Sequence, residues 1–290
     1  MQFWQSISYN SPEDCVALAR TAEAAGFDGV SLAEHIFHPL QLKSRHPYSP
    51  PDTPAFEVEE LWAEVWTTIT AMGMVTERLR FATAVNVLPL HNPFEIAKTT
   101  GTVARLTNHR VALGCGAGWM QEEFDAFGVD FHTRGKRFDE SIRLLRTLWT
   151  GQPVTFHGDF FHVDNVIMVP APQRPVPIWV GGRSKAAIRR AALQGDGWMA
   201  TGEPVAETIR IMTEIRAIRK GAGRDNPFEM MAIQPFPALT AETVSELADA
   251  GATSIKNFTF KFVMDNPQAT LAEKQDYLVR TGDTFISRFR

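Results

Sequence analysis

The chain has 290 residues, of which 44% are hydrophobic and 21% charged, as is usual for a globular protein, and its formal net charge is −4. This charge argues against a nucleic-acid partner, and the lack of an apolar run of about 18 residues argues against a membrane span. Two cysteines and an N-terminus without a signal-peptide pattern exclude a disulfide framework and predict a cytoplasmic protein.

Eight short apolar segments recur along the chain, and amphipathic helical patterns follow them. They cover residues 3–8, 29–35, 79–88, 110–119, 177–182, 197–200, 228–236 and 254–260. A capping residue before proline predicts three helix starts, at Ser11-Pro12, Asn92-Pro93 and Asn266-Pro267. Eight strand–helix units predict a single α/β domain over residues 1–290, folded as a closed (β/α)8 TIM barrel; an open doubly wound sheet is the alternative.

Two segments interrupt this alternation. Residues 36–62 follow the second segment and contain five prolines, at positions 39, 47, 50, 51 and 54. Because this insertion leaves the catalytic end of a strand, it is predicted to be a lid, with a disordered excursion as the alternative. Residues 151–176 alternate around Gly158-Asp159, which predicts a structural β-hairpin with a two-residue turn before the fifth segment, so His157 and His162 are not expected to be catalytic.

Candidate site residues stand where the predicted strands end, because barrel enzymes carry their chemistry there. They are mostly small, which favours a flat slot for a planar ring. Glycines without Cβ atoms would let the strand of "RVALGCGAGW" lie against such a ring, with a bulge or a tapering of the barrel as the alternative. A dinucleotide fingerprint is excluded, since its third glycine would fall at Trp119.

The same strand ends bear on two further kinds of site. Glu34, His35 and His38 are close together, but the later strand ends add no ligands, so no metal site is predicted. The run "GGRS" ends a strand and opens a helix. Its free N–H groups and the charge of Arg183 make a candidate phosphate site, with a simple glycine turn as the alternative.

Several motifs occur in an order and spacing that resemble a known family. They include "AEAAGFDGVSLAEH", "ATAVNVLPLHNPFEIAKTTGTV", "RVALGCGAGWMQEEFDAFGVDFHTRGKRFDE", "FHGDFF" and "PAPQRPVPIWVGGRSKAAIRRAALQGDGW". Together they resemble the luciferase-like monooxygenase family, the flavin- and deazaflavin-dependent barrel enzymes related to bacterial luciferase. The pattern around "GWMQEEFDAFGV" and "RGKRFDE" is most similar to the subgroup that uses coenzyme F420, an 8-hydroxy-5-deazaflavin.

The resemblance implies a planar cofactor in the mouth of the barrel, with Glu34 and His35 near its reacting carbon. It implies a bulge with a non-proline cis peptide at Thr83–Ala84. It implies no second catalytic acid directly after the strand glycines, because Trp119 and Met120 stand there, and no sugar-phosphate substrate. The cofactor-binding residues that it implies are Thr83, Ala84 and Asn86 at the bulge, Gly116, Ala117, Gly118 and Trp119 along the ring, and Val180, Gly181, Gly182, Arg183 and Ser184 at the phosphate.

The resulting hypothesis is an oxidoreductase that moves a hydride between F420 and a small organic substrate, with His35 as proton donor or acceptor. A purely orienting hydrogen bond is the alternative role for His35. The alternative functions are an FMN-dependent monooxygenase supplied by a separate flavin reductase, and a barrel that binds flavin without turnover. A homodimer is expected, and the substrate stays open.

Overall fold

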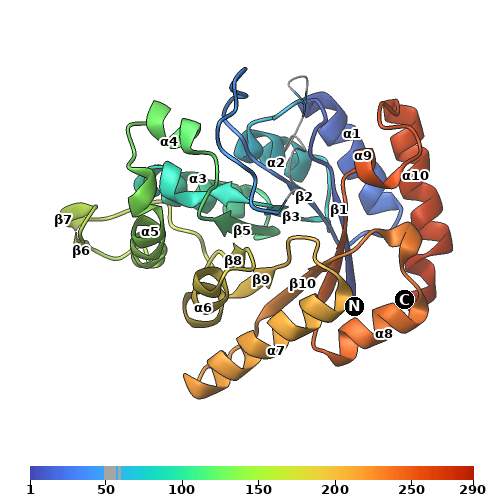
Figure 1. Cartoon of the computed structure of the whole chain (residues 1–290). Helices are drawn as coiled ribbons and strands as arrows, with labels where there is room; N and C mark the ends of the chain where they lie inside the picture. Colours follow the sequence, from blue (N-terminus) through green and yellow to red (C-terminus); the bar gives the residue numbers. More distant parts are fainter. Residues whose placement is uncertain (49–56, 58–59) are drawn as a thin grey trace.

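The structure is a computed structural model that describes residues 1–48, 57 and 60–290. Parallel strands form a closed barrel with helices around it (Figure 1), as the sequence predicts in preference to an open sheet. The barrel closes because β1 pairs with β11 and β3 pairs with β5. Its strands are β1 (Gln2–Ser6), β2 (Gly29–Leu32), β3 (Arg80–Thr83), β5 (Val111–Gly116), β8 (Ile178–Gly181), β9 (Gly197–Met199), β10 (Glu229–Ile233) and β11 (Ser254–Asn257).

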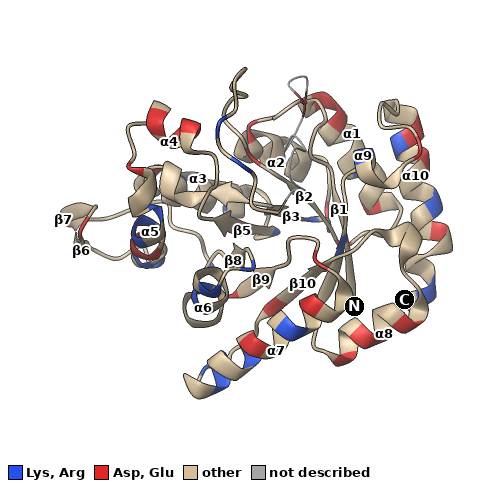
Figure 2. Ribbon diagram, in the orientation of Figure 1, with Lys and Arg blue, Asp and Glu red and all other residues tan. Residues whose placement is uncertain are grey.

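Helices surround the strands, and the longer ones bury one face against them. The helices are α1 (Pro12–Ala24), α2 (Val65–Met74), α3 (Pro93–Leu106), α4 (Gln121–Ala126), α5 (Arg134–Leu148), α6 (Lys185–Gln194), α7 (Val205–Gly221), α8 (Ala241–Asp249), α9 (Phe260–Val263) and α10 (Leu271–Thr284). On α7 and α10, charges of both signs are interspersed, whereas α8 carries acidic residues only (Figure 2). None of the helices in the described ranges is both long and apolar enough to cross a membrane.

Two of the three predicted helix starts are confirmed. The side chains of Ser11 and Asn92 each accept a hydrogen bond from a backbone N–H in the first turn of α1 and α3. The third is wrong, because α10 begins at Leu271, beyond Asn266-Pro267. Its cap is Thr270, which exchanges hydrogen bonds with Glu273 in a capping box, and this reciprocal pair satisfies more of the orphan N–H groups than asparagine alone.

The strand predicted at residues 79–88 is interrupted at its centre. β3 ends at Thr83, and the chain pairs with β5 again as β4 (Asn86–Val87). The interruption agrees with the expected bulge, but its non-proline cis peptide joins Ala84 to Val85, one bond later than the predicted Thr83–Ala84. The bulge brings Val85 to the wall of the barrel mouth.

The strand glycines make room for this bulge. A Cβ at Gly114 would overlap the carbonyl oxygen of Thr83. A Cβ at Gly116 would come within 2.6 Å of Val85 Cγ2, and one at Gly181 within 2.8 Å of Val85 Cγ1. The bulge therefore accounts for these glycines, which contact another part of the backbone and a valine side chain before any ring.

Large side chains fill the barrel below the bulge. The buried cluster inside it consists of Trp4, Ala82, Ala112, Trp179, Met199 and Met231. The rings of Trp4 and Trp179 meet edge to face with centroids 5.5 Å apart. Because the barrel is packed at this level, the space for a ligand lies above it, at the carboxyl ends of the strands.

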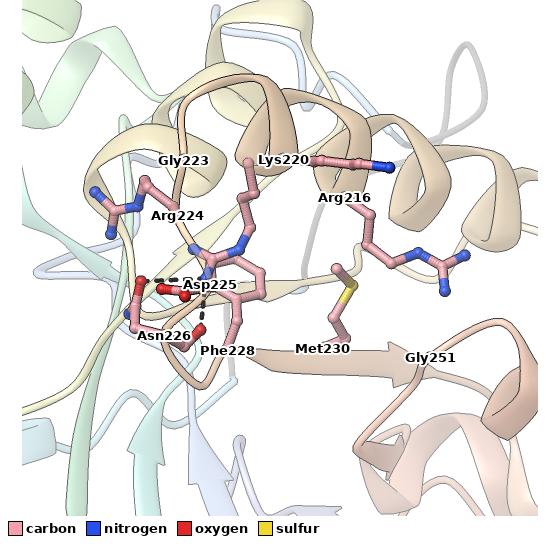
Figure 3. A pocket seen from close by; sticks show the side chains of 10 residues that line it. Arg216, Lys220, Gly223, Arg224, Asp225, Asn226, Phe228, Met230 and Gly251 are labelled. Carbon is pink, nitrogen blue, oxygen red and sulfur yellow. Dashed lines mark hydrogen bonds between the residues drawn. The ribbon is translucent and has the colours of Figure 1, made fainter.

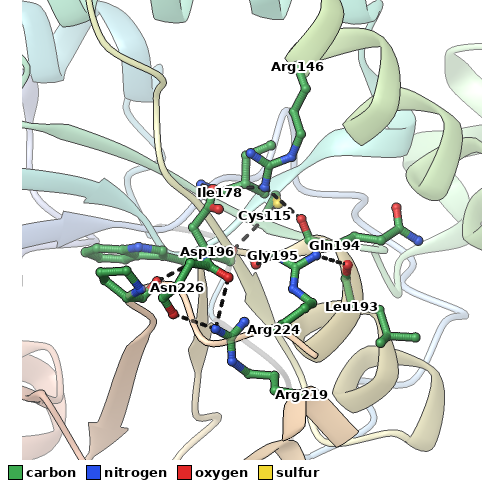
Figure 4. A network of polar contacts seen from close by, with 12 residues as sticks. Cys115, Arg146, Ile178, Leu193, Gln194, Gly195, Asp196, Arg219, Arg224 and Asn226 are labelled. Atoms are coloured by element: carbon green, nitrogen blue, oxygen red, sulfur yellow. Dashed lines mark hydrogen bonds and ion pairs between the residues drawn. The ribbon is translucent and has the colours of Figure 1, made fainter. Parts of the chain in front are cut away.

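A polar network holds the opposite end of the barrel together (Figure 4). Asp196 Oδ2 accepts hydrogen bonds from Arg146 Nη2 at 2.9 Å and from the backbone N–H of Ile178 at 3.0 Å. Arg224 Nη2 donates to the carbonyl of Gly195 at 3.1 Å. These bonds connect α5, the start of β8, and the turns before β9 and β10, and they support the barrel away from its mouth.

The hairpin predicted within residues 151–176 is present as β6 (Val154–His157) and β7 (His162–Val166). Its loop has the four residues 158–161, where the sequence predicted a two-residue turn. The reason is Glu140, whose carboxylate accepts hydrogen bonds from the backbone N–H groups of Asp159, Phe160 and Phe161. This carboxylate stabilises the longer loop, which is tied to α5 and not to the mouth.

Candidate active site

A cavity of about 980 Å³ opens at the barrel mouth. Ten of the predicted site residues line it, and they come from the ends of β2, the bulge, β5 and β8. They are Glu34, His35, Ala84, Gly116, Ala117, Gly118, Trp119, Gly181, Gly182 and Ser184. The fold thus brings most of the predicted set together around one space.

Four predicted cofactor-binding residues do not line the cavity. Thr83 Oγ1 donates to the carbonyl of Gly114 at 2.6 Å, and Asn86 Nδ2 donates to Glu34 Oε2 at 2.9 Å, so both side chains serve the bulge. Val180 is fully buried among the core residues behind the strand. Arg183 is exposed, and its guanidinium lies over the ring of Tyr48, 4.7 Å from the centroid.

Glu34 holds the bulge in place from the end of β2. Its Oε2 also accepts a hydrogen bond from the backbone N–H of Val87 at 2.8 Å, and its Oε1 forms an ion pair with His91 Nε2 at 2.9 Å. Burial would lower the pKa of His91, but the contact with Glu34, together with the charges of Glu123 and Glu64, outweighs burial and raises it. Because these contacts engage both oxygens of Glu34, the geometry favours a positioning role over the predicted catalytic one.

His35 is paired with an acid that the sequence did not predict. Its Nδ1 lies 3.1 Å from Glu123 Oε1, which also accepts a hydrogen bond from the backbone N–H of Ile36 at 2.8 Å. Glu123 is only 1% exposed. A proton on Nδ1 directed at this carboxylate gives a neutral ring its lone pair on Nε2. The only signal in the sequence was the acidic pair Glu122-Glu123, one turn beyond the strand glycines.

Aromatic rings surround this pair. Trp62, from the end of the insertion, and Trp119 approach the His35 ring edge-on, with centroids 4.7 Å and 5.6 Å away. The His35 side chain is 9% exposed. A titratable group held by a carboxylate in a mostly aromatic setting suits proton transfer in a site with little water.

The described part of the insertion lies over the cavity. Residues 44–48 line it, and Trp62 lines it from the other end of the segment. Residues 49–56 and 58–59, with Pro50, Pro51 and Pro54, lie outside the described residues, so the predicted lid stays a prediction. Glu122 fixes the near end, since its Oε1 accepts hydrogen bonds from the N–H groups of Lys43 at 2.7 Å and Ser44 at 2.9 Å.

We expect Glu122→Gln to loosen this attachment. Burial would raise the pKa of Glu122, but its hydrogen bonds to Ser44 and Lys43 hold it at about 2, so the carboxylate is charged throughout the neutral range. The neutral amide should weaken both bonds, and amide exchange at Lys43 and Ser44 should accelerate by about tenfold. Glu207→Gln, on the exposed side of α7, is the control. Equal exchange in wild type and Glu122→Gln would show that Glu122 does not hold the segment.

The predicted phosphate loop has the backbone that its glycines imply. Gly182 has a φ of +115°, which favours glycine, and the Ser184 hydroxyl caps α6 by accepting a hydrogen bond from Ala187 N–H at 3.2 Å. The Tyr48 hydroxyl accepts a hydrogen bond from Arg183 N–H at 3.5 Å. An oxygen therefore already contacts a backbone donor at this helix start.

A second hollow lies at the other end of the barrel (Figure 3). It has a volume of about 480 Å³, and Arg216, Lys220 and Arg224 are among its lining residues, near the start of β10. None of the predicted site residues lines it. The residues that the structure describes also contain no group of three or more His, Cys, Asp or Glu that could hold a metal ion.

Comparisons with known proteins show which family the chain belongs to. The model of the luciferase-like monooxygenase family matches residues 2–283. An uncharacterized protein of Mycobacterium tuberculosis is 38% identical over 240 residues, which cover 83% of each chain. An F420-dependent glucose-6-phosphate dehydrogenase of Tsukamurella paurometabola is 31% identical over 225 residues, which cover 74% of this chain and 61% of the relative.

A solved structure has the same fold. It is an F420-dependent secondary alcohol dehydrogenase in complex with an F420–acetone adduct, with a TM-score of 0.77 over 99% of this chain and 98% of that one, at 17% identity. At this identity the likeness shows the fold alone. The family match over nearly the full length, on a barrel whose mouth carries the predicted residues, shows that the chain belongs to the luciferase-like monooxygenase family.

Proposed function

We propose that this protein is an oxidoreductase that transfers a hydride between coenzyme F420 and a small organic substrate. One observation carries the proposal: the cavity has glycine backbone and Val85 on one side, and His35, which is paired with the buried Glu123, lines it. The F420-dependent relative supports the choice of cofactor.

The residues of the mouth fit a flat ring with a phosphate tail. Ala84, Val85 and Gly116 form a mostly apolar wall, and the first turn of α6, which follows Gly182, offers backbone N–H groups to an anion. When bound, F420 supplies hydride donation and acceptance at its C5. The chain supplies orientation through this wall and excludes water through Trp62 and Trp119.

His35 supplies the proton chemistry in this proposal. Reduction of a carbonyl group to an alcohol requires a proton at oxygen, and the reverse reaction requires its removal. Nδ1 of His35 is held by Glu123, so Nε2 is the nitrogen that gives or takes this proton. Glu123 acts as a positioning residue that sets the tautomer of the ring.

Turnover with each cofactor tests the proposal. Reduced F420 is mixed anaerobically with the protein and a panel of small ketones, aldehydes and oxo acids, and the absorbance of oxidised F420 is followed. We expect substrate-dependent oxidation of F420. Substrate-dependent oxygen uptake with reduced FMN, and none of these changes with F420, would indicate the monooxygenase instead. Binding without turnover of either cofactor would indicate a non-catalytic barrel.

We expect His35→Asn to lower kcat by about 10²–10⁴-fold, the usual contribution of general acid–base catalysis, while the Kd for F420 changes less than about threefold. Asparagine can still contact Glu123 but cannot carry the proton. His162→Asn, in the exposed hairpin, is the matched control. A loss of kcat below tenfold would assign His35 the orienting role that the sequence left open.

A further inference from the structure

Lys256 occupies an unusual position inside the barrel. It is the third residue of β11, its side chain is only 7% exposed, and it lines the mouth cavity. Its partners in register are Trp4 on β1 and Ile233 on β10. Trp4 belongs to the apolar cluster that fills the barrel. Successive side chains of a strand point to opposite faces, so Lys256 shares the face of Trp4, and its neighbours Ile255 and Asn257 are on the other face. Lys256 therefore faces the interior.

No described residue neutralises this ammonium group. Lys261 forms an ion pair with Glu60, and Lys274 donates a hydrogen bond to Asn10 at 2.7 Å, but Lys256 has neither kind of partner among the described residues. Burial lowers its pKa to about 8, so it still carries a positive charge at neutral pH. A buried cation without a counterion is costly, and such groups concentrate at functional sites.

The position of β11 in the barrel shows on which side of the cavity Lys256 lies. In the strand order of the closed barrel, β11 and β5 are four strands apart in both directions, so Lys256 stands across the cavity from the glycine wall. The bulge and the start of α6, the parts that suit a planar cofactor, lie on the β3, β5 and β8 side. The space beside Lys256 is the part of the cavity opposite that wall.

We propose that Lys256 binds a carboxylate of the substrate, so that the enzyme acts on a small organic acid. The assignment to substrate rests on the proposed function, whereas the anion site itself does not. Of the arginines that line the cavity, Arg190 pairs with Asp139 at 2.7 Å, Arg134 lies over the Phe131 ring at 3.8 Å, and Arg45 is exposed on the insertion, so Lys256 is the buried cation without a partner among the described residues. One buried uncompensated charge matches a monoanionic carboxylate better than a phosphate, which requires more donors.

The test uses the apoprotein and small probe anions. N-hydroxysuccinimidyl acetate acetylates accessible lysines, and peptide mass spectrometry measures the rate at Lys256 and at the exposed Lys220. We expect acetate, benzoate or oxalate to slow acetylation of Lys256 at least fivefold without changing Lys220, and benzamide, the uncharged analogue of benzoate, to have no effect. By titration calorimetry, Lys256→Met should raise the Kd of the protecting carboxylate about tenfold, and Lys220→Met should leave it unchanged.

Each outcome bears on the assignment. If none of the three carboxylates protects Lys256, or if Lys256→Met binds the protecting one as wild type does, the site is refuted. Stronger protection by inorganic phosphate than by every carboxylate would refute the carboxylate class. Circular dichroism of Lys256→Met checks the fold. The Kd of F420 is measured on the same samples: failure to bind F420 with carboxylate protection intact refutes the proposed function alone.

Discussion

Gly114→Ala is expected to destabilise the folded barrel by more than about 4 kcal/mol, which approaches the whole stability of many domains. The added Cβ would overlap the carbonyl oxygen of Thr83 and come within 2.7 Å of Met199 Sδ. The methionine side chain could move, but the Thr83 carbonyl is part of the bulge. Thr83 is also held in place because its Oγ1 donates a hydrogen bond to the Gly114 carbonyl. The backbone there has little freedom to shift.

Urea unfolding followed by circular dichroism measures this effect. Gly221→Ala is the matched control, because a Cβ at Gly221, the last residue of α7, meets no atom within 4 Å. That variant should gain about 0.5–1 kcal/mol from the higher helix propensity of alanine. A Gly114→Ala protein within about 1 kcal/mol of wild type would mean that the bulge does not pack against β5 as described.

Lys256→Met is expected to raise the free energy of unfolding by about 3 kcal/mol at pH 7, at about 1.4 kcal/mol per pKa unit. The reason is the pKa of Lys256, which burial lowers from 10.5 to about 8 in the folded state. Between these values the unfolded chain binds more protons than the folded one, so wild-type stability rises with pH. The destabilisation is complete below pH 8 and is lost as the pH rises to about 10.5.

Thermal or urea unfolding at pH 7 and pH 10 provides the measurement, with Lys220→Met as the exposed control. The difference between Lys256→Met and wild type should shrink at the higher pH, while Lys220→Met should match wild type at both. A Lys256→Met protein that is less stable than wild type at pH 7 would contradict the account of an uncompensated buried charge, because it would show that the ammonium group contributes favourable contacts.

The repeating strand–helix pattern was sufficient to predict the barrel, because hydrophobic periodicity and strand length are local properties. The strand glycines were a local signal too, and they correctly indicated a close approach. Their contact partners, Thr83 and Val85, lie about 30 positions earlier, so the sequence could not tell a backbone from a bound ring. Thr83 and Asn86 were expected at the cofactor only from the family resemblance, and their hydrogen-bond partners, Gly114 and Glu34, are likewise distant in the sequence.

The site residues that were missed depend on tertiary geometry. Glu123 reaches His35 because the short helix α4 folds back over the mouth, a turn that no motif announced. Lys256 lay within an apolar segment, where the alternation of Ile255 and Lys256 could have indicated that the lysine faces the barrel interior. Arg183 was chosen for its charge, but that charge lies over Tyr48, a residue of the insertion whose course is not readable from composition.

Equilibrium binding of the two cofactors tests the central claim, that the glycine-walled mouth holds F420. Oxidised F420 and FMN are titrated separately into wild type and Gly182→Val, whose β-branched side chain is strained at a φ of +115° and would crowd Ala187 and Tyr48. We expect F420 to bind at least tenfold more tightly than FMN, and Gly182→Val to weaken F420 binding at least tenfold with its circular dichroism unchanged. Tighter binding of FMN than of F420, or equal binding of F420 by both proteins, would contradict the account.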